Sequence, residues 1–167
     1  MTFRTRAPVR RTAGGPLSAA GFIVVTMAVG GSGAAATASN LSTWYAALRK
    51  PPFNPPNAVF GPVWTVLYIS MAIAAWRVWR SAPPAPRRTA LVLYGVQLVL
   101  NFLWSVIFFG LRQPGAAFAE VLVLFAAVMA TGAAFWRQDR WAGVIMVPYA
   151  AWVAFAGVLN LAVWRLN

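Results

Sequence analysis

Five long apolar stretches divide this sequence, and short polar or charged segments separate them. An apolar run of about 20 residues is long enough to cross the hydrocarbon core of a bilayer as an α-helix. The pattern therefore predicts an all-α integral membrane protein, a five-transmembrane-helix bundle. The expected spans are residues 17–39, 61–79, 89–109, 116–136 and 141–164.

The polar segments complete the expected domain organisation. Residues 1–16 form a basic N-terminal tail, and residues 17–167 form a single membrane domain. The first connection holds four prolines, which favour extended or turn-like backbone, so we expect it to be stiff. A basic, proline-rich hinge is expected between the second and third spans. Pro62 is expected in the first turn of its span, where a missing amide hydrogen is harmless.

The first apolar stretch has a second interpretation. Arg10 and Arg11 precede a short apolar core, and residues 36–38 resemble the small-residue site at which an export signal is cleaved. In that case the segment would be removed from the mature protein. The uncharged length of residues 17–39 favours a span, and the export signal remains the alternative.

Charge adds an orientation to this picture. The net charge of +12 could indicate a nucleic-acid surface, but the basic residues lie almost entirely between or beyond the apolar runs, so no nucleic-acid partner is expected. The N-terminus with the second and fourth connections carries ten basic residues, and the other side carries four. We therefore expect a bacterial cell membrane protein with a cytoplasmic N-terminus, in contact with anionic lipid headgroups.

The composition excludes most enzyme chemistry. The chain has no cysteine and no histidine, and its acids are Glu120 and Asp139. The sequence therefore lacks the residues that zinc sites, cysteine or histidine nucleophiles and paired-carboxylate hydrolysis require. Neither a metal site nor an obligatory cofactor is expected. Glu120 lies one turn inside a span, where an ionisable group is a functional candidate. We expect it to be neutral or to pair with a basic group such as Arg112.

Polar and aromatic side chains recur on one face of three spans. The three sets are Trp64 with Tyr68, Gln97 with Asn101 and Trp104, and Tyr149 with Trp152, Ala156 and Asn160. Amides need partners in a bilayer, so these faces should meet inside the bundle. They could form a pocket for a flat hydrophobic ligand, or the amides could simply hold helices together. Similarly, glycines 30, 31 and 33 suit close helix contact or a dimer interface.

Four sequence signatures resemble a known family. They are Trp44-Tyr45 with Lys50-Pro51-Pro52-Phe53-Asn54-Pro55-Pro56, Phe60-Gly61-Pro62-Val63-Trp64-Thr65-Val66-Leu67-Tyr68, Gln97-Leu98 with Leu100-Asn101-Phe102 and Trp104, and Pro148-Tyr149 with Trp152, Phe155-Ala156 and Leu159-Asn160. In this order, over nearly all of residues 44–167, they are similar to the TspO/MBR family of tryptophan-rich sensory proteins and translocator proteins.

The resemblance implies a five-helix bundle, usually a homodimer, whose pocket lies beneath the first loop. It implies binding of protoporphyrin-like tetrapyrroles, sterols and synthetic benzodiazepine-site ligands by a receptor or transporter-like protein. The ligand-binding residues expected from the family motifs and the polar faces together are Phe60, Gly61, Val63, Trp64, Tyr68, Asn101, Trp104, Trp152, Ala156, Leu159 and Asn160. The expected pocket-mouth residues are Arg49, Lys50, Pro55 and Pro56.

Three departures from the family pattern bear on the ligand. Phe53 replaces a frequent second tryptophan of the first loop, and Ala116 stands where animal members carry tryptophan. Leu161 and Ala162 follow Asn160 without a tyrosine, so the motif proposed for cholesterol is incomplete. The resemblance therefore favours porphyrin over sterol as the ligand.

Two hypotheses of function follow. In the first, a membrane receptor or transporter-like protein stacks protoporphyrin IX against its pocket tryptophans, and Arg49 and Lys50 pair with the propionates. Without histidine or cysteine as axial ligands, metal-free porphyrin is expected to bind better than haem. In the second, the protein degrades porphyrin in light, because positions matching Trp64 and Trp152 are implicated in that reaction in some bacterial family members.

Overall fold

The computed structural model describes residues 15–167, and this part of the chain is helical throughout except for short connections. Its elements are α1 (Pro16–Leu41), α2 (Trp44–Ala47), α3 (Asn57–Ser81), α4 (Pro84–Ser105), the π-helical turn η1 (Val106–Gly110), α5 (Pro114–Gln138) and α6 (Arg140–Leu166). The basic tail expected at residues 1–16 lies almost entirely outside the described residues, as do Arg10 and Arg11.

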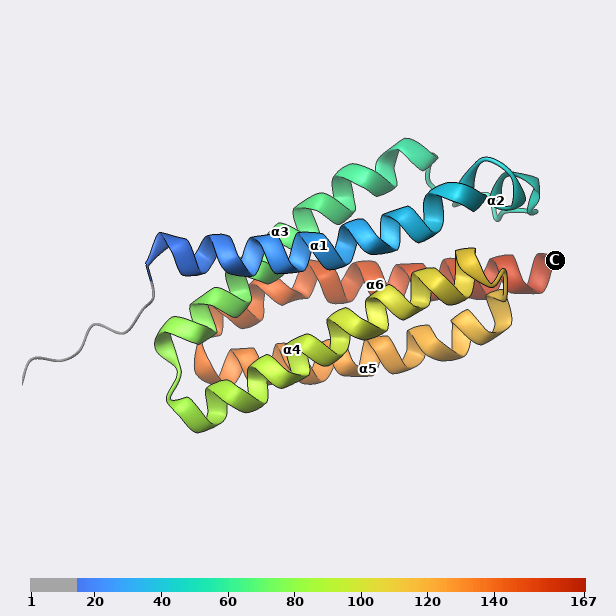
Figure 1. Ribbon diagram of the computed structural model, residues 1–167. Coiled ribbons are helices and arrows are strands. Elements are labelled where there is room, and N and C mark those ends of the chain that lie inside the picture. Colours follow the sequence, from blue (N-terminus) through green and yellow to red (C-terminus); the bar gives the residue numbers. More distant parts are fainter. Residues whose placement is uncertain (1–14) are drawn as a thin grey trace, which may run out of the picture.

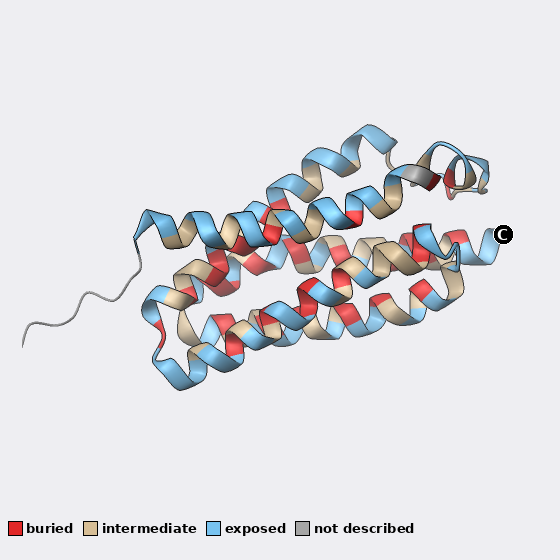
Figure 2. Cartoon of the chain, viewed as in Figure 1, coloured by how far each residue is buried: buried red, intermediate tan, exposed pale blue. Residues whose placement is uncertain are grey.

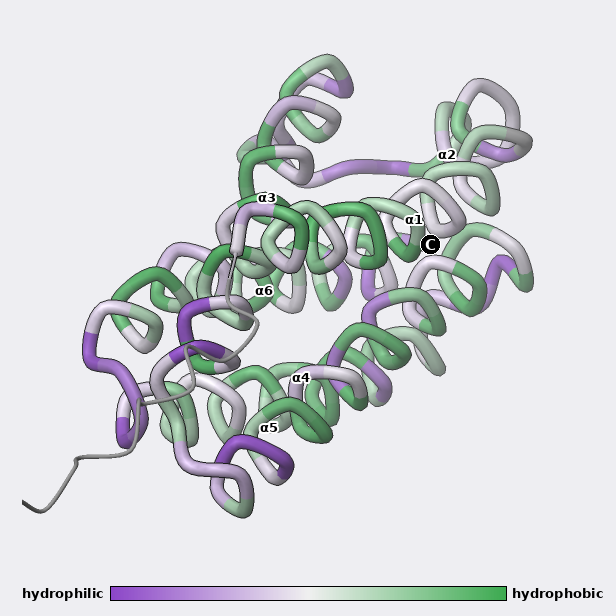
Figure 3. Tube along the Cα trace, turned by 60° about the vertical axis from the view of Figure 1, so that its left-hand side comes forward, coloured by the Kyte–Doolittle hydropathy of each residue, from purple (hydrophilic) through white to green (hydrophobic). Residues whose placement is uncertain are grey.

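Five helical segments are long and apolar enough to cross a membrane. They cover Pro16–Ala38, Asn57–Ser81, Pro84–Gly110, Pro114–Gln138 and Arg140–Leu166. The long helices lie side by side (Figure 1), and hydrophobic positions fill their middles while hydrophilic ones collect at the connections (Figure 3). The expected all-α bundle of five transmembrane helices is confirmed.

The second span begins earlier than expected, and this changes the place of Pro62 in its helix. The second span begins at Asn57 rather than at residue 61, and Pro56 is its N-cap. Pro62 consequently lies inside α3 and not in its first turn. Because proline has no amide hydrogen, the carbonyl of Ala58 loses its helical partner, close to the membrane surface. The loop itself also contains helical structure, the short α2.

The proline-rich hinge between the second and third spans is much shorter than expected. Helix α4 begins at Pro84 rather than at residue 89, and Ala82 and Pro83 alone separate it from α3. Pro84 and Pro86 both fall in the first turn of α4, where backbone amides have no helical partner, so proline there does not interrupt the helix. Most of the residues expected in a hinge therefore extend a membrane helix.

The first helix packs as an integral part of the bundle. The hydroxyls of Thr26 and Tyr94 are 2.6 Å apart, and Trp76 Nε1 donates to Ser18 Oγ at 3.1 Å. A Cβ added at Gly30 would overlap the ring of Tyr68, and one at Gly33 would lie 3.2 Å from Ser105 Oγ. These two glycines therefore make close helix contacts within one chain.

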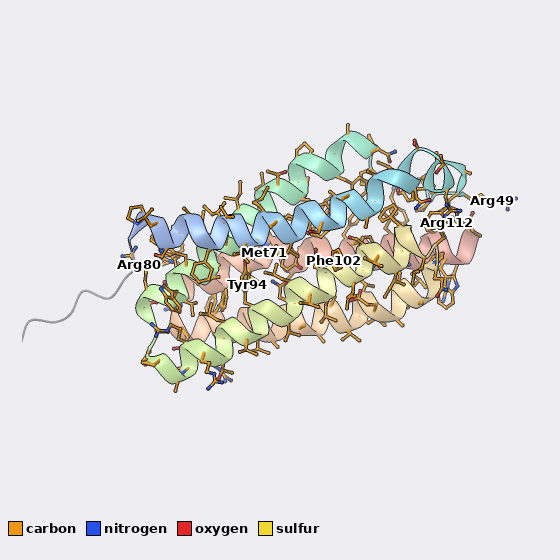
Figure 4. The ribbon with its side chains drawn as sticks, in the orientation of Figure 1. Arg49, Met71, Arg80, Tyr94, Phe102 and Arg112 are labelled. Carbon is orange, nitrogen blue, oxygen red and sulfur yellow. The ribbon has the colours of Figure 1, made fainter. Side chains whose placement is uncertain are left out.

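The core lies along the inward faces of the helices. Figure 2 shows buried positions where the helices face one another and exposed positions on the outside. Tyr149, Phe135 and Met71 are fully buried, and Gln97 is a fully buried amide among them. The side chains of Met71 and Tyr94 point into the space between the helices (Figure 4). Apolar side chains outside the core face the region that the bilayer occupies.

Asp139 fixes the connection between α5 and α6. Its carboxylate accepts hydrogen bonds from the amides of Trp141 (2.9 Å) and Ala142 (3.2 Å), which caps α6, and it forms an ion pair with Arg77 of α3 at 2.8 Å. Burial alone would raise the pKa of Asp139, but the bonds from Arg77 and the two amides outweigh burial and lower it. The carboxylate thus joins three helices at one end of the bundle.

This arrangement makes stability depend on pH in an acidic window. A carboxylate whose pKa is lowered in the folded state stabilises the fold fully at pH values above its ordinary pKa of 3.8. This stabilisation is lost as the pH falls through the folded-state pKa. We expect Asp139→Ala to lower the stability by about 1–2 kcal/mol, because a cap is lost. Asp139→Asn should keep the cap and abolish the acid-dependent loss. Melting curves of both variants from pH 7 to 3 check this, and an unchanged acid profile in Asp139→Asn would contradict it.

Candidate ligand pocket

One cavity of about 510 Å³ opens inside the bundle. Helices α1, α3 and α6, the end of α4 with η1, and the loop residue Tyr45 surround it. Ligand pockets for small molecules commonly have roughly 300–1,000 Å³, so the size is sufficient for one. Nine of the residues expected to bind ligand line it: Phe60, Gly61, Trp64, Tyr68, Trp104, Trp152, Ala156, Leu159 and Asn160.

One group of aromatic side chains comes from α3 and α6. Trp64 stacks on Tyr68 one turn below it, with ring centroids 5.4 Å apart and an interplanar angle of 27°. Phe60 meets Trp152 edge-to-face at 5.9 Å. The spacing of four residues along α3 places all three of its aromatics on one face. This face presents a broad apolar surface to the cavity.

A second aromatic group comes from the end of α4. Trp104 stacks on Phe108 at 5.3 Å and meets Phe109 edge-to-face at 6.0 Å. The π-helical turn makes this possible, because its i→i+5 bonds align residues five apart, as seen in the bond from Leu111 N to Val106 O at 2.8 Å. π-helical turns occur frequently at functional sites. Here the turn brings two consecutive phenylalanines to one cluster beside the pocket.

Helix α1 supplies a lining that sequence reasoning did not include. Its contribution is Met27, Gly30, Gly31, Gly33, Ala34, Thr37, Ala38 and Leu41. Most of these side chains are small, so they leave space next to the aromatic surfaces. Their signal in the sequence was the glycine and alanine content of the first span, which is equally typical of close helix packing.

Few polar groups reach the cavity. Trp104 Nε1 donates to Asn160 Oδ1 at 3.0 Å, and Asn160 Nδ2 donates to the carbonyl of Pro114 at 2.7 Å, so both side chains are engaged. The Nε1 of Trp152, by contrast, is buried and has no hydrogen-bond partner among the described residues. A buried donor without a partner is costly. Trp152 is therefore a pocket indole whose N–H no described residue occupies.

Beneath the pocket a chain of hydrogen bonds joins three helices. Tyr68 donates to Asn101 Oδ1, Asn101 Nδ2 donates to the hydroxyl of Tyr149 at 3.2 Å, and Tyr149 donates to Gln97 Oε1 at 2.9 Å. The three polar faces thus meet as expected. Asn101 does not line the cavity, however, and its amide holds helices together. Tyr68 connects the two regions, since its ring borders the pocket.

The remaining expected residues lie outside the cavity lining. Val63 is half-buried and packs against the core on a neighbouring face of α3. Pro55 and Pro56 belong to the segment that leads into α3. Lys50 Nζ lies 4.7 Å from the ring centre of Tyr45 and near the carbonyls of Ala46 and Leu48. Since Tyr45 itself lines the pocket, Lys50 is one side chain away from it.

Hydrogen bonds hold the first loop at two places. The backbone of Arg49 exchanges two hydrogen bonds of 3.0 Å with the side chain of Asn167, which fixes the loop to the end of α6. Tyr45 donates to Asn54 Oδ1 at 3.0 Å. Burial raises the pKa of Tyr45, although this bond lowers it in part. The loop is thus held over one end of the pocket, with the Arg49 side chain exposed.

Glu120 does not pair with Arg112. The guanidinium of Arg112 binds Asn40 Oδ1 through Nε at 3.1 Å and Nη2 at 2.7 Å, and so joins the turn before α5 to the end of α1. Both carboxylate oxygens of Glu120 are buried and have no hydrogen-bond partner among the described residues. Glu120 does not line the pocket. Its environment suits a neutral carboxylic acid.

These features define a class of protein: a polytopic helical membrane protein with an aromatic pocket inside its bundle. Within residues 15–167 no group of histidine, cysteine or acidic side chains is placed to hold a metal ion. The model of the TspO/MBR family matches residues 22–165, which include most of α1, and the chain belongs to this family.

Relatives come from all three domains of life. The chain is 38% identical to a tryptophan-rich protein TspO of Archaeoglobus fulgidus, over 87% of this chain and 94% of the relative. It is 44% identical to a tryptophan-rich sensory protein of Cereibacter sphaeroides (74% and 77% covered) and 41% identical to the translocator protein of Homo sapiens (74% and 75% covered).

Proposed function

We propose that this protein binds a flat hydrophobic molecule of the tetrapyrrole class, protoporphyrin IX, and acts in porphyrin sensing, transport or regulation. The observation that carries the proposal is the convergence of Trp64, Trp104 and Trp152 on one cavity. Aromatic faces stack on planar π-systems, and a mostly apolar pocket with few polar groups suits such a ligand. The free Nε1 of Trp152 would donate to a polar atom at the ligand's edge.

The carboxylates of the ligand would lie toward the first loop. Lys50 stands against Tyr45 at the loop side of the pocket, and Arg49 is exposed beside it. The Lys50 ammonium lies near the carbonyls of Ala46 and Leu48, and the backbone of Arg49 is fixed by Asn167, so pairing with propionates orders little additional backbone. Sterols are a further candidate ligand of the same apolar cavity.

The proposal is tested by titrating the detergent-purified protein with protoporphyrin IX in the dark and following the porphyrin absorbance. Trp64→Phe/Trp152→Phe should weaken binding about tenfold, which corresponds to roughly 1.4 kcal/mol of lost stacking and hydrogen bonding. Trp136→Phe/Trp141→Phe is the matched control, because these tryptophans are exposed and do not line the pocket. Equal weakening in both variants, or no saturable binding at all, would refute the proposal.

The metal content of the ligand provides a separate prediction. Because the sequence has neither histidine nor cysteine, haem iron would lack its strongest usual axial ligands. The protein should therefore gain nothing from the iron and should bind metal-free protoporphyrin more tightly than haem. Parallel titrations with the two compounds measure the preference. A lower dissociation constant for haem would contradict this prediction and would point to another side chain as iron ligand.

A second candidate function is light-dependent porphyrin degradation. The observation that favours it is that Trp64 and Trp152 border the same cavity, with Trp64 stacked on Tyr68 at 5.4 Å. An excited porphyrin at this position could take one electron from an adjacent indole, and the degradation of the porphyrin would consume dioxygen from solution as the oxidant. Illumination of the complex should then bleach the porphyrin only when protein is bound. A Trp152→Phe variant that binds porphyrin but bleaches it at the full rate would argue against this function.

We further propose a bacterial cell membrane as the location, with the N-terminus in the cytoplasm and a homodimer as the assembly. The support for orientation is the distribution of charge. Arg80 lies at one end of the bundle, and Arg49 and Arg112 lie at the other (Figure 4). Labelling of single cysteines introduced at Ala85 and Pro52 in intact cells tests the orientation, and access to Ala85 from outside would reverse it. Support for the homodimer comes from family membership.

A further inference from the structure

A groove lies at the end of the bundle that is remote from the first loop. Trp79 of α3 and five residues of α4 line it: Pro84, Arg87, Arg88, Leu91 and Val92. Both helices begin or end at this level, and the membrane-crossing segments extend away from it in one direction. The groove is therefore at the depth where lipid headgroups meet the hydrocarbon region.

Arg87 is held in place within this groove. Its guanidinium stacks over the ring of Trp79, with the central carbon 4.5 Å from the ring centroid, and Nη1 donates to the Trp79 carbonyl at 3.2 Å. Planar stacking combined with one hydrogen bond leaves the other guanidinium donors directed outward. Because the side chain is already ordered, binding an anion through it costs little further conformational entropy.

The positive charge of the groove is not neutralised by the described residues. The ion pair formed within residues 15–167 joins Arg77 to Asp139, and Glu120 lies inside the membrane span of α5. Arg87 and Arg88 thus have no carboxylate partner in this part of the chain. Two consecutive arginines, one half-buried and one exposed, line the groove and offer guanidinium donors of the kind that bind phosphate bidentately.

An apolar surface continues from the groove toward the middle of the membrane. Val92, Val96 and Val99 follow Arg88 at spacings of three or four residues, so they share one face of α4. They are 57%, 47% and 57% exposed, which makes them a stripe open to the bilayer. A cationic groove at headgroup depth above such a stripe matches both ends of a phospholipid, its phosphate and its acyl chain.

We propose that the groove is a binding site for an anionic phospholipid. Arg87 and Arg88 hold the phosphate, Trp79 supports the Arg87 guanidinium, and an acyl chain runs along the valine stripe. The two arginines select lipids with net negative charge, because the cationic headgroup of a zwitterionic lipid is repelled. The site is independent of the pocket at the other end of the bundle and of whatever ligand that pocket takes.

The experiment uses the full chain in a neutral detergent. Its melting temperature is measured with added dioleoyl phosphatidylglycerol, with dioleoyl phosphatidylcholine, and with inorganic phosphate. Phosphatidylglycerol at about 100 times its dissociation constant should raise the melting temperature by roughly 5–10 °C. Phosphatidylcholine and inorganic phosphate should each produce less than half of this shift. A full shift with inorganic phosphate would overturn the lipid assignment in favour of a free anion.

Two double variants separate the groove from general surface charge. Arg87→Gln/Arg88→Gln should lose more than half of the shift. Arg80→Gln/Arg140→Gln removes the same charge from the same end, and these arginines also stack on tryptophans (Trp76 and Trp136) but do not line the groove. This control should keep the shift. Equal losses in both variants, or no loss in either, would overturn the proposal.

The single variant Arg88→Gln tests the site even if the double variant fails to fold. Arg88 is exposed, so its replacement leaves the packing of α3 and α4 intact. It should lose about half of the lipid-induced shift while its melting temperature without lipid stays within about 2 °C of the unmodified protein. A full lipid-induced shift in Arg88→Gln would contradict a phosphate held between the two arginines.

Discussion

Ala156→Phe should weaken ligand binding at least about a hundredfold while leaving the bundle folded. Ala156 is half-buried, lies one turn below Trp152 on α6 and lines the cavity. A phenylalanine ring projecting from this position would occupy the space beside the Trp152 indole. Because the ring enters an existing cavity instead of a packed core, the usual overpacking penalty of about 1–3 kcal/mol should be mostly avoided.

The expected loss of affinity is large because the ring competes directly with the ligand. Displacing a stacked ligand from even part of the cavity removes several favourable contacts at once. A loss of about 2.8 kcal/mol of binding free energy corresponds to a dissociation constant about a hundredfold larger. We expect a loss of at least about this size for protoporphyrin. The titration used for the tryptophan variants measures it.

Ala154→Phe is the matched control for this experiment. Ala154 is two residues earlier on α6 and is exposed on the outer face of the helix, so the same ring would face lipid. Its affinity for porphyrin should be unchanged. If Ala156→Phe binds as well as Ala154→Phe, the cavity is not the ligand site, and the proposed function falls with it.

Much of the fold was predictable because the bilayer imposes a simple rule. Backbone groups in hydrocarbon must be paired, so each uncharged run of sufficient length had to be a helix. The runs around Leu67, Leu98 and Val153 were therefore assigned correctly. Helix ends were less predictable, since proline both stops helices and begins them. Pro84 and Pro86 were interpreted as a hinge, whereas both lie in the first turn of α4.

The large pocket residues that share a helix face with polar side chains were predictable from the sequence. The small pocket residues were not. Trp64, Trp104 and Trp152 stood out because each shares one face of its expected span with polar side chains. The pocket residues of α1 did not stand out, because residues such as Gly31 and Ala34 have no functional group in their side chains. The π-helical turn was also invisible, since a run such as Val106–Gly110 suits an ordinary α-helix equally well. Periodicity therefore identified the faces but not the empty space between them.

Asn101 illustrates a further limit. Its place between Gln97 and Trp104 made it suitable both for a ligand contact and for a helix contact. One turn of helix separates the two outcomes, since Trp104 borders the cavity and Asn101 lies below it between Tyr68 and Tyr149. The decision depends on how deep the cavity extends, which no spacing along one helix encodes.

Gly30→Ala should destabilise the protein, although alanine is the better helix former. A Cβ at Gly30 would overlap the Tyr68 ring. That ring cannot easily move aside, because its hydroxyl is bonded to Asn101 and its face stacks on Trp64. The intrinsic helix preference favours alanine by about 1 kcal/mol, but relief of the overlap must shift α1 or break the Tyr68 contacts. The cost in packing should exceed the gain in helix preference.

Gly31→Ala is the control that isolates this effect. A Cβ at Gly31 meets nothing within 4 Å, so the same substitution there should leave the melting temperature unchanged or raise it slightly. We expect Gly30→Ala to melt lower by roughly 3–6 °C, which for a chain of this length corresponds to about 1–2 kcal/mol. The displaced ring should also weaken porphyrin binding, because Tyr68 and Trp64 form one stacked surface of the pocket. If both variants melt alike, the close approach of α1 to α3 at Gly30 does not determine the stability of the bundle.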